Sequence, residues 1–119
     1  MISSALQELA ASTTTMGTME NPELVGRVGT PGEGPFMTMY LRMESGRISE
    51  ARFETYGCPT AIACGTWVTQ WLSGKTPEQA GVLTASDLTM VLGGLPLGKE
   101  HCAALAVDSL RHGLSQLCE

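Results

Sequence analysis

The sequence predicts an α+β domain in which helices pack against one face of a small antiparallel sheet. Strand-like alternation of apolar and polar residues is confined to residues 36–56, and helical spacing dominates from residue 58 onwards. Strands that precede the helices, rather than alternating with them, are typical of the α+β class. With 119 residues and no internal repeat, the chain has the length of one domain with one modest core.

The N-terminal segment carries a helical pattern of its own. Apolar residues recur there at helical spacing: Ile2, Ala5, Leu6 and Leu9. A polar connector follows at residues 12–15. Proline and glycine within residues 21–26 then indicate the start of the folded domain. We therefore expect an N-terminal helix and connector over residues 1–18 and a single domain over residues 19–119.

Two segments alternate as half-buried strands do. Apolar and polar side chains take turns over residues 36–43, with the methionines on one face, and again over residues 48–56. A turn at residues 44–47 joins them, which predicts an antiparallel hairpin. The preceding residues 29–35 are rich in glycine and proline and are therefore predicted to form a loop.

Four helices are expected after the hairpin. The first follows Cys58 and ends at Gly74. Thr76 opens the second, with proline and glutamine where a capping box needs them, and Thr84 opens the third. The last begins near Lys99 and has a clear buried stripe: Ala103, Val107, Leu110, Leu114 and Leu117.

Charge and composition exclude several classes of function. Seven Lys and Arg against twelve Asp and Glu leave a net charge of -5, whereas a nucleic-acid surface needs clustered cations. No apolar run has the ~20 residues of a membrane helix, and the N-terminus lacks the pattern of a secretion signal. We therefore expect a cytoplasmic protein without nucleic-acid or membrane partners. In that reducing compartment its four cysteines favour metal binding or sulfur chemistry over disulfides, although no C-x-x-C pair is present.

Cys58 lies at the predicted junction between a strand and a helix. A helix N-terminus offers unsatisfied N–H groups and a partial positive charge, which both favour a thiolate. The thiolate is the form that binds a metal or attacks sulfur. The alternative is a small buried hydrophobic residue, the commonest role of an unmodified cysteine. We expect that role for Cys64, six residues later.

His101 and Cys102 open the last predicted helix. Neighbouring residues on a helix are about 100° apart, so both side chains can flank one ion over the N-terminus, where Lys99 also favours the thiolate. Glu33, held between glycines in the loop, is a candidate carboxylate ligand. With Cys58 these residues make a mixed N, S and O set that suits tetrahedral zinc or an iron–sulfur cluster with incomplete thiolate ligation. The alternatives are a surface histidine beside a core cysteine, and a solvated glutamate.

The elements and motifs, in this order, resemble the U-type scaffold family of iron–sulfur cluster assembly, the IscU and NifU N-terminal domain proteins. The resemblance spans residues 21–117 and rests on four segments: 21–26 (NPELVG), 51–63 (ARFETYGCPTAIA), 74–76 (GKT) and 95–102 (LPLGKEHC). It implies the fold of that family, a small three-stranded antiparallel sheet packed on one face by about four helices.

The resemblance also implies the bound group and the partners. Family members build a two-iron two-sulfur cluster with sulfur from a cysteine desulfurase, release it to apo-proteins, and bind zinc at the same site. It follows by resemblance that Cys58 is the second family cysteine and that His101 and Cys102 are the family's His-Cys pair. The first loop departs from the pattern, because Glu33 stands where the family has a cysteine and Pro35 where it has an aspartate. A homo-oligomer is compatible with the sequence.

Three functions are open to such a chain. The leading hypothesis is a scaffold, not an enzyme, that binds a labile two-iron two-sulfur cluster, or an iron or zinc ion, through Cys58, His101, Cys102 and the candidate ligand Glu33. The alternative is a zinc-binding structural or adaptor protein of the same fold that no longer assembles clusters. A third and less favoured hypothesis is an enzyme in which Cys58 is the nucleophile, His101 the base and Glu33 the group that orients the imidazole.

Overall fold

The computed structural model describes residues 15–30, 36–55, 59–95, 99 and 101–116. The N-terminal helix expected at the start of the chain lies outside the described residues. Three strands form one sheet in the order β1-β2-β3, antiparallel throughout: β1 (Leu24–Val28), β2 (Met37–Glu44) and β3 (Arg47–Thr55). The helices follow: α2 (Pro59–Leu72), α3 (Pro77–Ala80), α4 (Ala85–Val91) and α5 (His101–Ser115). The predicted α+β class is confirmed.

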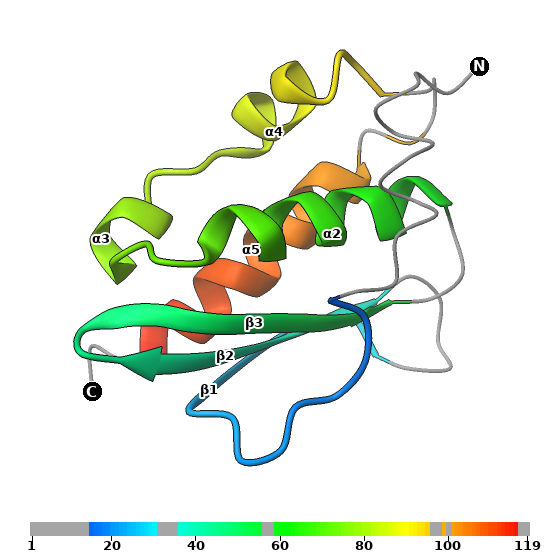
Figure 1. Cartoon of the computed structure of the whole chain (residues 1–119). Helices are drawn as coiled ribbons and strands as arrows, with labels where there is room; N and C mark the ends of the chain where they lie inside the picture. Colours follow the sequence, from blue (N-terminus) through cyan, green and yellow to red (C-terminus); the bar gives the residue numbers. More distant parts are fainter. Residues whose placement is uncertain (1–14, 31–35, 56–58, 96–98, 100, 117–119) are drawn as a thin grey trace.

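The elements form layers on one side of the sheet. Helices α2 and α5 lie on the same face, α2 against β3 and α5 against β1 and β2. Helix α4 packs on α5 and lies farthest from the sheet (Figure 1). None of the helices in the described part of the chain is long and apolar enough to cross a membrane.

The β2–β3 hairpin presents the predicted apolar face to the helices. Met37, Met39 and Leu41 are fully buried, as the alternation predicted. The register shifts between Arg42 and Met43, and beyond this irregularity Met43 is only half-buried. The predicted hairpin is therefore confirmed, with a bulge near its turn that the alternation did not reveal.

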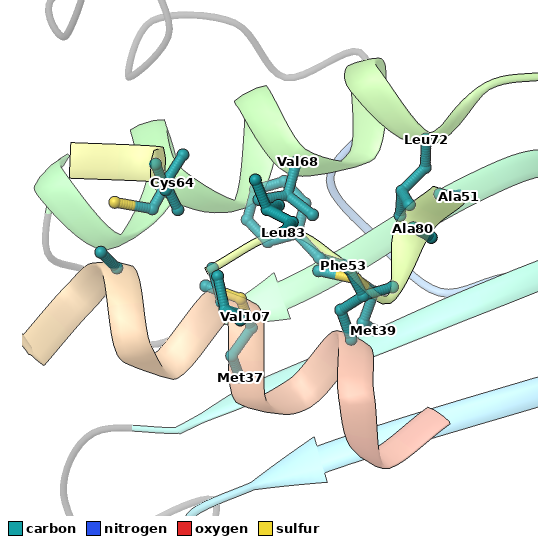
Figure 2. Close-up of a cluster of buried hydrophobic side chains, with 14 of the residues drawn as sticks. Met37, Met39, Ala51, Phe53, Cys64, Val68, Leu72, Ala80, Leu83 and Val107 are labelled. Atoms are coloured by element: carbon teal, nitrogen blue, oxygen red, sulfur yellow. The ribbon is translucent and has the colours of Figure 1, made fainter. Parts of the chain in front are cut away.

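The core lies between this face and α2. Phe53 points from β3 towards α2 and Val68 of the helix (Figure 2), and Leu72 of the same helix belongs to the same buried cluster. Gly65 lets the helix approach the ring, because a Cβ built on Gly65 would lie 2.5 Å from two atoms of the Phe53 ring. A glycine inside a helix usually destabilises it, and here close packing against an aromatic ring offsets that cost.

The opposite face of the sheet is partly covered by the chain that leads into β1. This segment, blue in Figure 1, begins beside β3, where Gly17 N–H donates to the Phe53 carbonyl and Phe53 N–H donates to the Thr15 carbonyl. It then crosses the sheet, and Met19 within it is buried. Thr38, which alternation places on the polar face, is only 5% exposed.

The predicted helix starts at Thr76 and Thr84 are confirmed. Each threonine side chain accepts from the backbone N–H three residues later, and Gln79 and Asp87 return a bond to the backbone N–H of the cap. Both helices are therefore held by capping boxes.

Candidate metal centre

Four element ends meet at one end of the sheet. In the antiparallel register Val28 pairs with Met37, and Met37 pairs with Thr55, so the end of β1, the start of β2 and the end of β3 are adjacent. Helix α2 begins at Pro59, shortly after β3 ends, and runs back along it, since Gly74 N–H donates to the Ile48 carbonyl near the start of β3. The α2 N-terminus therefore lies at this same end.

Helix α5 also starts at this end. Near its C-terminus, His112 contacts Arg27 and, one turn later, Gln116 contacts Val25, so α5 runs antiparallel to β1. Its first residue, His101, therefore lies towards the end of β1, and Figure 1 shows the starts of α2 and α5 at the same side of the molecule. Two helix N-termini that converge in this way favour thiolate and other anionic ligands.

A hydrogen bond joins two residues that flank the predicted ligand segments. Thr55 Oγ1 donates to the Phe36 carbonyl at 2.6 Å. Phe36 directly follows residues 31–35, which contain Glu33, and Thr55 directly precedes residues 56–58, which contain Cys58. No local pattern in the sequence predicts this bond, because the two residues are 19 positions apart.

His101 and Cys102 are the two predicted ligands within the described residues. Cys102 is 1% exposed, whereas the His101 side chain is exposed, and Cys102 N–H donates to the Lys99 carbonyl at 3.0 Å. The Sγ of Cys102 lies 3.7 Å from the Nε2 of His101. The first two side chains of α5 thus bring one sulfur and one nitrogen donor together.

This separation fits one shared metal ion. A tetrahedral zinc with Zn–S of about 2.3 Å and Zn–N of about 2.05 Å places its sulfur and nitrogen ligands about 3.6 Å apart. Soft sulfur with imidazole nitrogen also suits zinc and iron. The donor pair therefore fits the predicted metal or cluster in type and in spacing.

The other two predicted ligands, Glu33 and Cys58, lie outside the described residues. Within the described ranges, no three His, Cys, Asp or Glu side chains gather as a metal site would require. The four-ligand set from the sequence therefore stays a prediction, of which His101 and Cys102 are the described half.

Two further cysteine and histidine side chains of the described residues have structural roles. Cys64 is fully buried in the core, as expected. His112, on the same helix as the predicted ligands, is exposed, yet its Nδ1 accepts from Arg27 N–H at 2.8 Å. It therefore holds an edge strand at the opposite end of α5 from the predicted ligands.

A polar pair near the end of β3 was not found from the sequence. Tyr40 donates to Glu54 Oε1 at 2.5 Å across the hairpin. Burial, followed by this hydrogen bond, raises the pKa of Tyr40 to about 12. The phenol therefore stays protonated at neutral pH and acts as a donor to the carboxylate. Tyr40 directly follows the inward-facing Met39, and Glu54 directly follows the inward-facing Phe53, so both side chains lie on the other face of the sheet. This alternation was the feature of the sequence from which the pair could have been predicted.

Comparison with protein families gives a match over almost the whole chain. A family model described as the NifU-like N terminal domain matches residues 3–118. "Iron-sulfur cluster assembly scaffold protein IscU 1" of Archaeoglobus fulgidus is 40% identical over 99 residues, 83% of this chain and 65% of the relative. The scaffold protein IscU of Escherichia coli is 37% identical over 91 residues, 76% of this chain and 70% of the relative. The match to the archaeal relative thus covers slightly less than two thirds of that protein.

Solved structures show the same fold. A putative iron-sulfur cluster assembly scaffold protein for the SUF system from Fervidobacterium islandicum superposes with a TM-score of 0.73 at 21% identity, over 94% of this chain and 95% of that one. A NifU-like protein (N-terminal) from Brucella abortus gives a TM-score of 0.76 at 18% identity, over 97% and 92% of the chains. At these identities the likeness establishes the fold alone.

Proposed function

The chain belongs to the NifU-like N-terminal domain family, and from this premise we propose that it is a scaffold for iron–sulfur cluster assembly rather than an enzyme. Its cargo is a labile two-iron two-sulfur cluster, or an iron or zinc ion bound in its place. The observation that carries the proposal is the 3.7 Å separation of Cys102 Sγ and His101 Nε2 at the start of α5. Cys58 and Glu33 are the proposed third and fourth ligands.

The two described ligands differ in exposure in a way that suits transfer of a cargo. Cys102 is enclosed by the core, which holds its sulfur in one place, while the His101 imidazole faces solvent. An exposed ligand can be exchanged for an incoming thiolate of a recipient without disturbing the core. A resident structural metal has no need of such a ligand, because closed sites with four protein ligands are typical of structural zinc.

The proposed partners follow from the relatives. The names of the archaeal and bacterial relatives describe them as iron-sulfur cluster assembly scaffold proteins. We therefore propose a cysteine desulfurase as the sulfur source and apo-proteins as recipients. Glu33 in place of the family's first-loop cysteine leaves the chain with one thiolate fewer for this chemistry.

The test is cluster assembly on the full chain. The protein, purified without oxygen, is given iron, cysteine and a cysteine desulfurase, and iron, acid-labile sulfide and visible absorbance are measured. A working scaffold gains iron and sulfide in equal amounts, and Cys58→Ala and Cys102→Ala lose both. His101→Ala is compared with His112→Ala, since both histidines are exposed on α5 but only His101 lies at the proposed site. Circular dichroism checks that each variant is folded.

Two other results would redirect the proposal. One zinc per chain with no cluster under any condition, and a melting temperature that falls on chelation, would indicate the zinc-binding adaptor. Rapid alkylation of Cys58 in metal-free protein, coupled to turnover of an acyl substrate, would indicate a nucleophilic enzyme. Equal metal content in wild type, Cys58→Ala and Cys102→Ala would exclude the proposed site.

A further inference from the structure

Thr55 ends β3 and carries a hydroxyl that makes one additional bond. In the antiparallel register Thr55 pairs with Met37 at this end of the β2–β3 ladder. Its hydroxyl donates to the carbonyl of Phe36, one residue before β2 begins, at 2.6 Å. Valine would suit the strand equally well, because β-branched residues without a hydroxyl are also favoured there. The hydroxyl therefore adds a link that the strand itself does not require.

The backbone beside this bond is held from two further sides. Phe53 exchanges backbone hydrogen bonds with residues 15–17 on the edge of β3 that faces away from β2. Glu54 accepts a hydrogen bond from Tyr40. Each of the last three residues of β3 thus has a partner besides its ladder bonds, so the strand is restrained up to Thr55.

Covalent geometry limits how far two of the predicted ligands can lie from the bond. Glu33 is three residues before Phe36, and Cys58 is three residues after Thr55. A chain spans at most about 3.6 Å per residue, so each of these two Cα atoms lies within about 11 Å of the Cα at the nearer end of the bond. Cys58 also directly precedes Pro59, where α2 begins. A change in the separation of Phe36 and Thr55 therefore reaches each predicted ligand through only three residues.

We propose that Thr55 is a positioning residue for the predicted metal centre, a role that rests on the proposed function and extends it. Its hydroxyl keeps the segment that contains Glu33 close to the segment that contains Cys58, so a carboxylate and a thiolate are presented to one ion. Ligands that are held in place in the metal-free protein bind more tightly, because less conformational freedom is lost on binding. Loss of the groups that support metal ligands typically costs about 10- to 100-fold in affinity.

The test is cobalt(II) titration of the metal-free full chain, purified without oxygen. Cobalt reports thiolate ligands by its absorption in the near ultraviolet, and competition with a chelator gives its affinity. Thr55→Val removes the hydroxyl and keeps the shape and the strand propensity, and it should weaken cobalt affinity about tenfold. Thr55→Ser keeps the hydroxyl and should stay within about twofold of the wild type.

A matched variant separates positioning from general stability. Thr69→Val removes another hydroxyl that bonds backbone carbonyls, those of Gly65 and Thr66 within α2. It should lower the melting temperature of the metal-free protein without changing cobalt affinity. Equal cobalt affinities in Thr55→Val and the wild type, or equal losses of affinity in Thr55→Val and Thr69→Val, would overturn the proposal.

A double-variant cycle tests how Thr55 acts. Thr55→Val should weaken cobalt affinity about tenfold when Glu33 is present, but by less than about twofold in a Glu33→Gln background, because the separation of the two segments then no longer matters. Full additivity would overturn the positioning role. Failure of the wild type to bind cobalt, or unchanged binding in Cys102→Ala, would overturn the predicted metal centre as well, whereas a failure confined to the Thr55 variants leaves that centre standing.

Discussion

Gly26 of β1 lies against Gly113 of α5 with no side chain between the two backbones. A Cβ built on Gly26 would lie 1.8 Å from the Ser109 carbonyl oxygen and 2.6 Å from Gly113 N. A Cβ on Gly113 would meet a less severe clash, since it would lie 3.3 Å from Gly26 N. This contact sets how closely α5 packs on the sheet, and with it the position of the predicted ligands His101 and Cys102 at the start of α5.

Gly26→Ala should therefore destabilise the fold strongly. The methyl group must displace the backbone of α5; overpacking typically costs about 1–3 kcal/mol, and we expect a loss at the upper end of this range. Urea denaturation of the two proteins measures the loss. Gly113→Ala is the matched control and should change stability by less than about 1 kcal/mol, because improved helix propensity offsets the tighter contact. Equal losses in both variants would contradict the asymmetry of the contact.

The outer edge of β1 is covered by His112 near the end of α5 and by Gln116, which directly follows the helix. Gln116 accepts from Val25 N–H at 3.3 Å and donates to the Val25 carbonyl at 2.6 Å, and His112 accepts from Arg27 N–H. Gln116→Ala should cost about 1 kcal/mol from two lost hydrogen bonds and should promote self-association through the uncovered edge. Denaturation and light scattering measure the two effects. Ser115→Ala, an exposed change on the same turn, is the control, and aggregation at an equal rate in both variants would refute the edge explanation.

Thr66 of α2 carries a polar atom that the fold leaves unsatisfied. Its Oγ1 is fully buried. Among the described residues, this oxygen is the one buried side-chain oxygen or nitrogen that has no hydrogen-bond partner. Thr66→Val should stabilise the protein by about 1 kcal/mol, because it removes the desolvated hydroxyl and keeps the shape. Thermal unfolding provides the measurement.

Thr69 provides the control for this substitution. It is also buried on α2, but its hydroxyl bonds to Thr15 Oγ1 and to the carbonyls of Gly65 and Thr66. Thr69→Val should therefore destabilise the protein by about 1 kcal/mol. Destabilisation in both variants would show that the hydroxyl of Thr66 is satisfied in solution.

Tyr40 should titrate well above an ordinary tyrosine. Burial and the hydrogen bond to Glu54 raise its pKa from 10.0 to about 12. A pKa raised by folding means that the protonated phenol stabilises the native state; this contribution is complete below pH 10 and is lost between about pH 10 and 12. Tyrosinate absorbance, followed in the folded protein, should show one late phase. Tyr40→Phe should remove that phase, whereas a wild-type titration without a phase near pH 12 would contradict the prediction.

The local pattern of the sequence was enough for most of the elements. Alternation of apolar residues identified β2 and β3, because a strand exposes alternate side chains to opposite faces whatever lies around it. Capping signals at Thr76 and Thr84 located α3 and α4 for the same reason, since the bonds that start a helix join residues three positions apart. The sequence pattern did not locate β1, whose five residues contain a glycine and no alternation.

For the predicted metal centre, too, the sequence predicted one part and the tertiary structure decided the other. That His101 and Cys102 could share an ion followed from their adjacency at a predicted helix start, and their 3.7 Å separation is consistent with it. That this helix start lies beside the start of α2 is decided by contacts between Gly26 and Gly113 and between Val25 and Gln116, residues that are about 90 positions apart in the chain. Such contacts leave no local pattern, because each residue is chosen for a partner that only the folded chain brings near. The sequence by itself determined most of the elements and the chemistry of the predicted ligands, and the tertiary structure decided which ends of those elements meet.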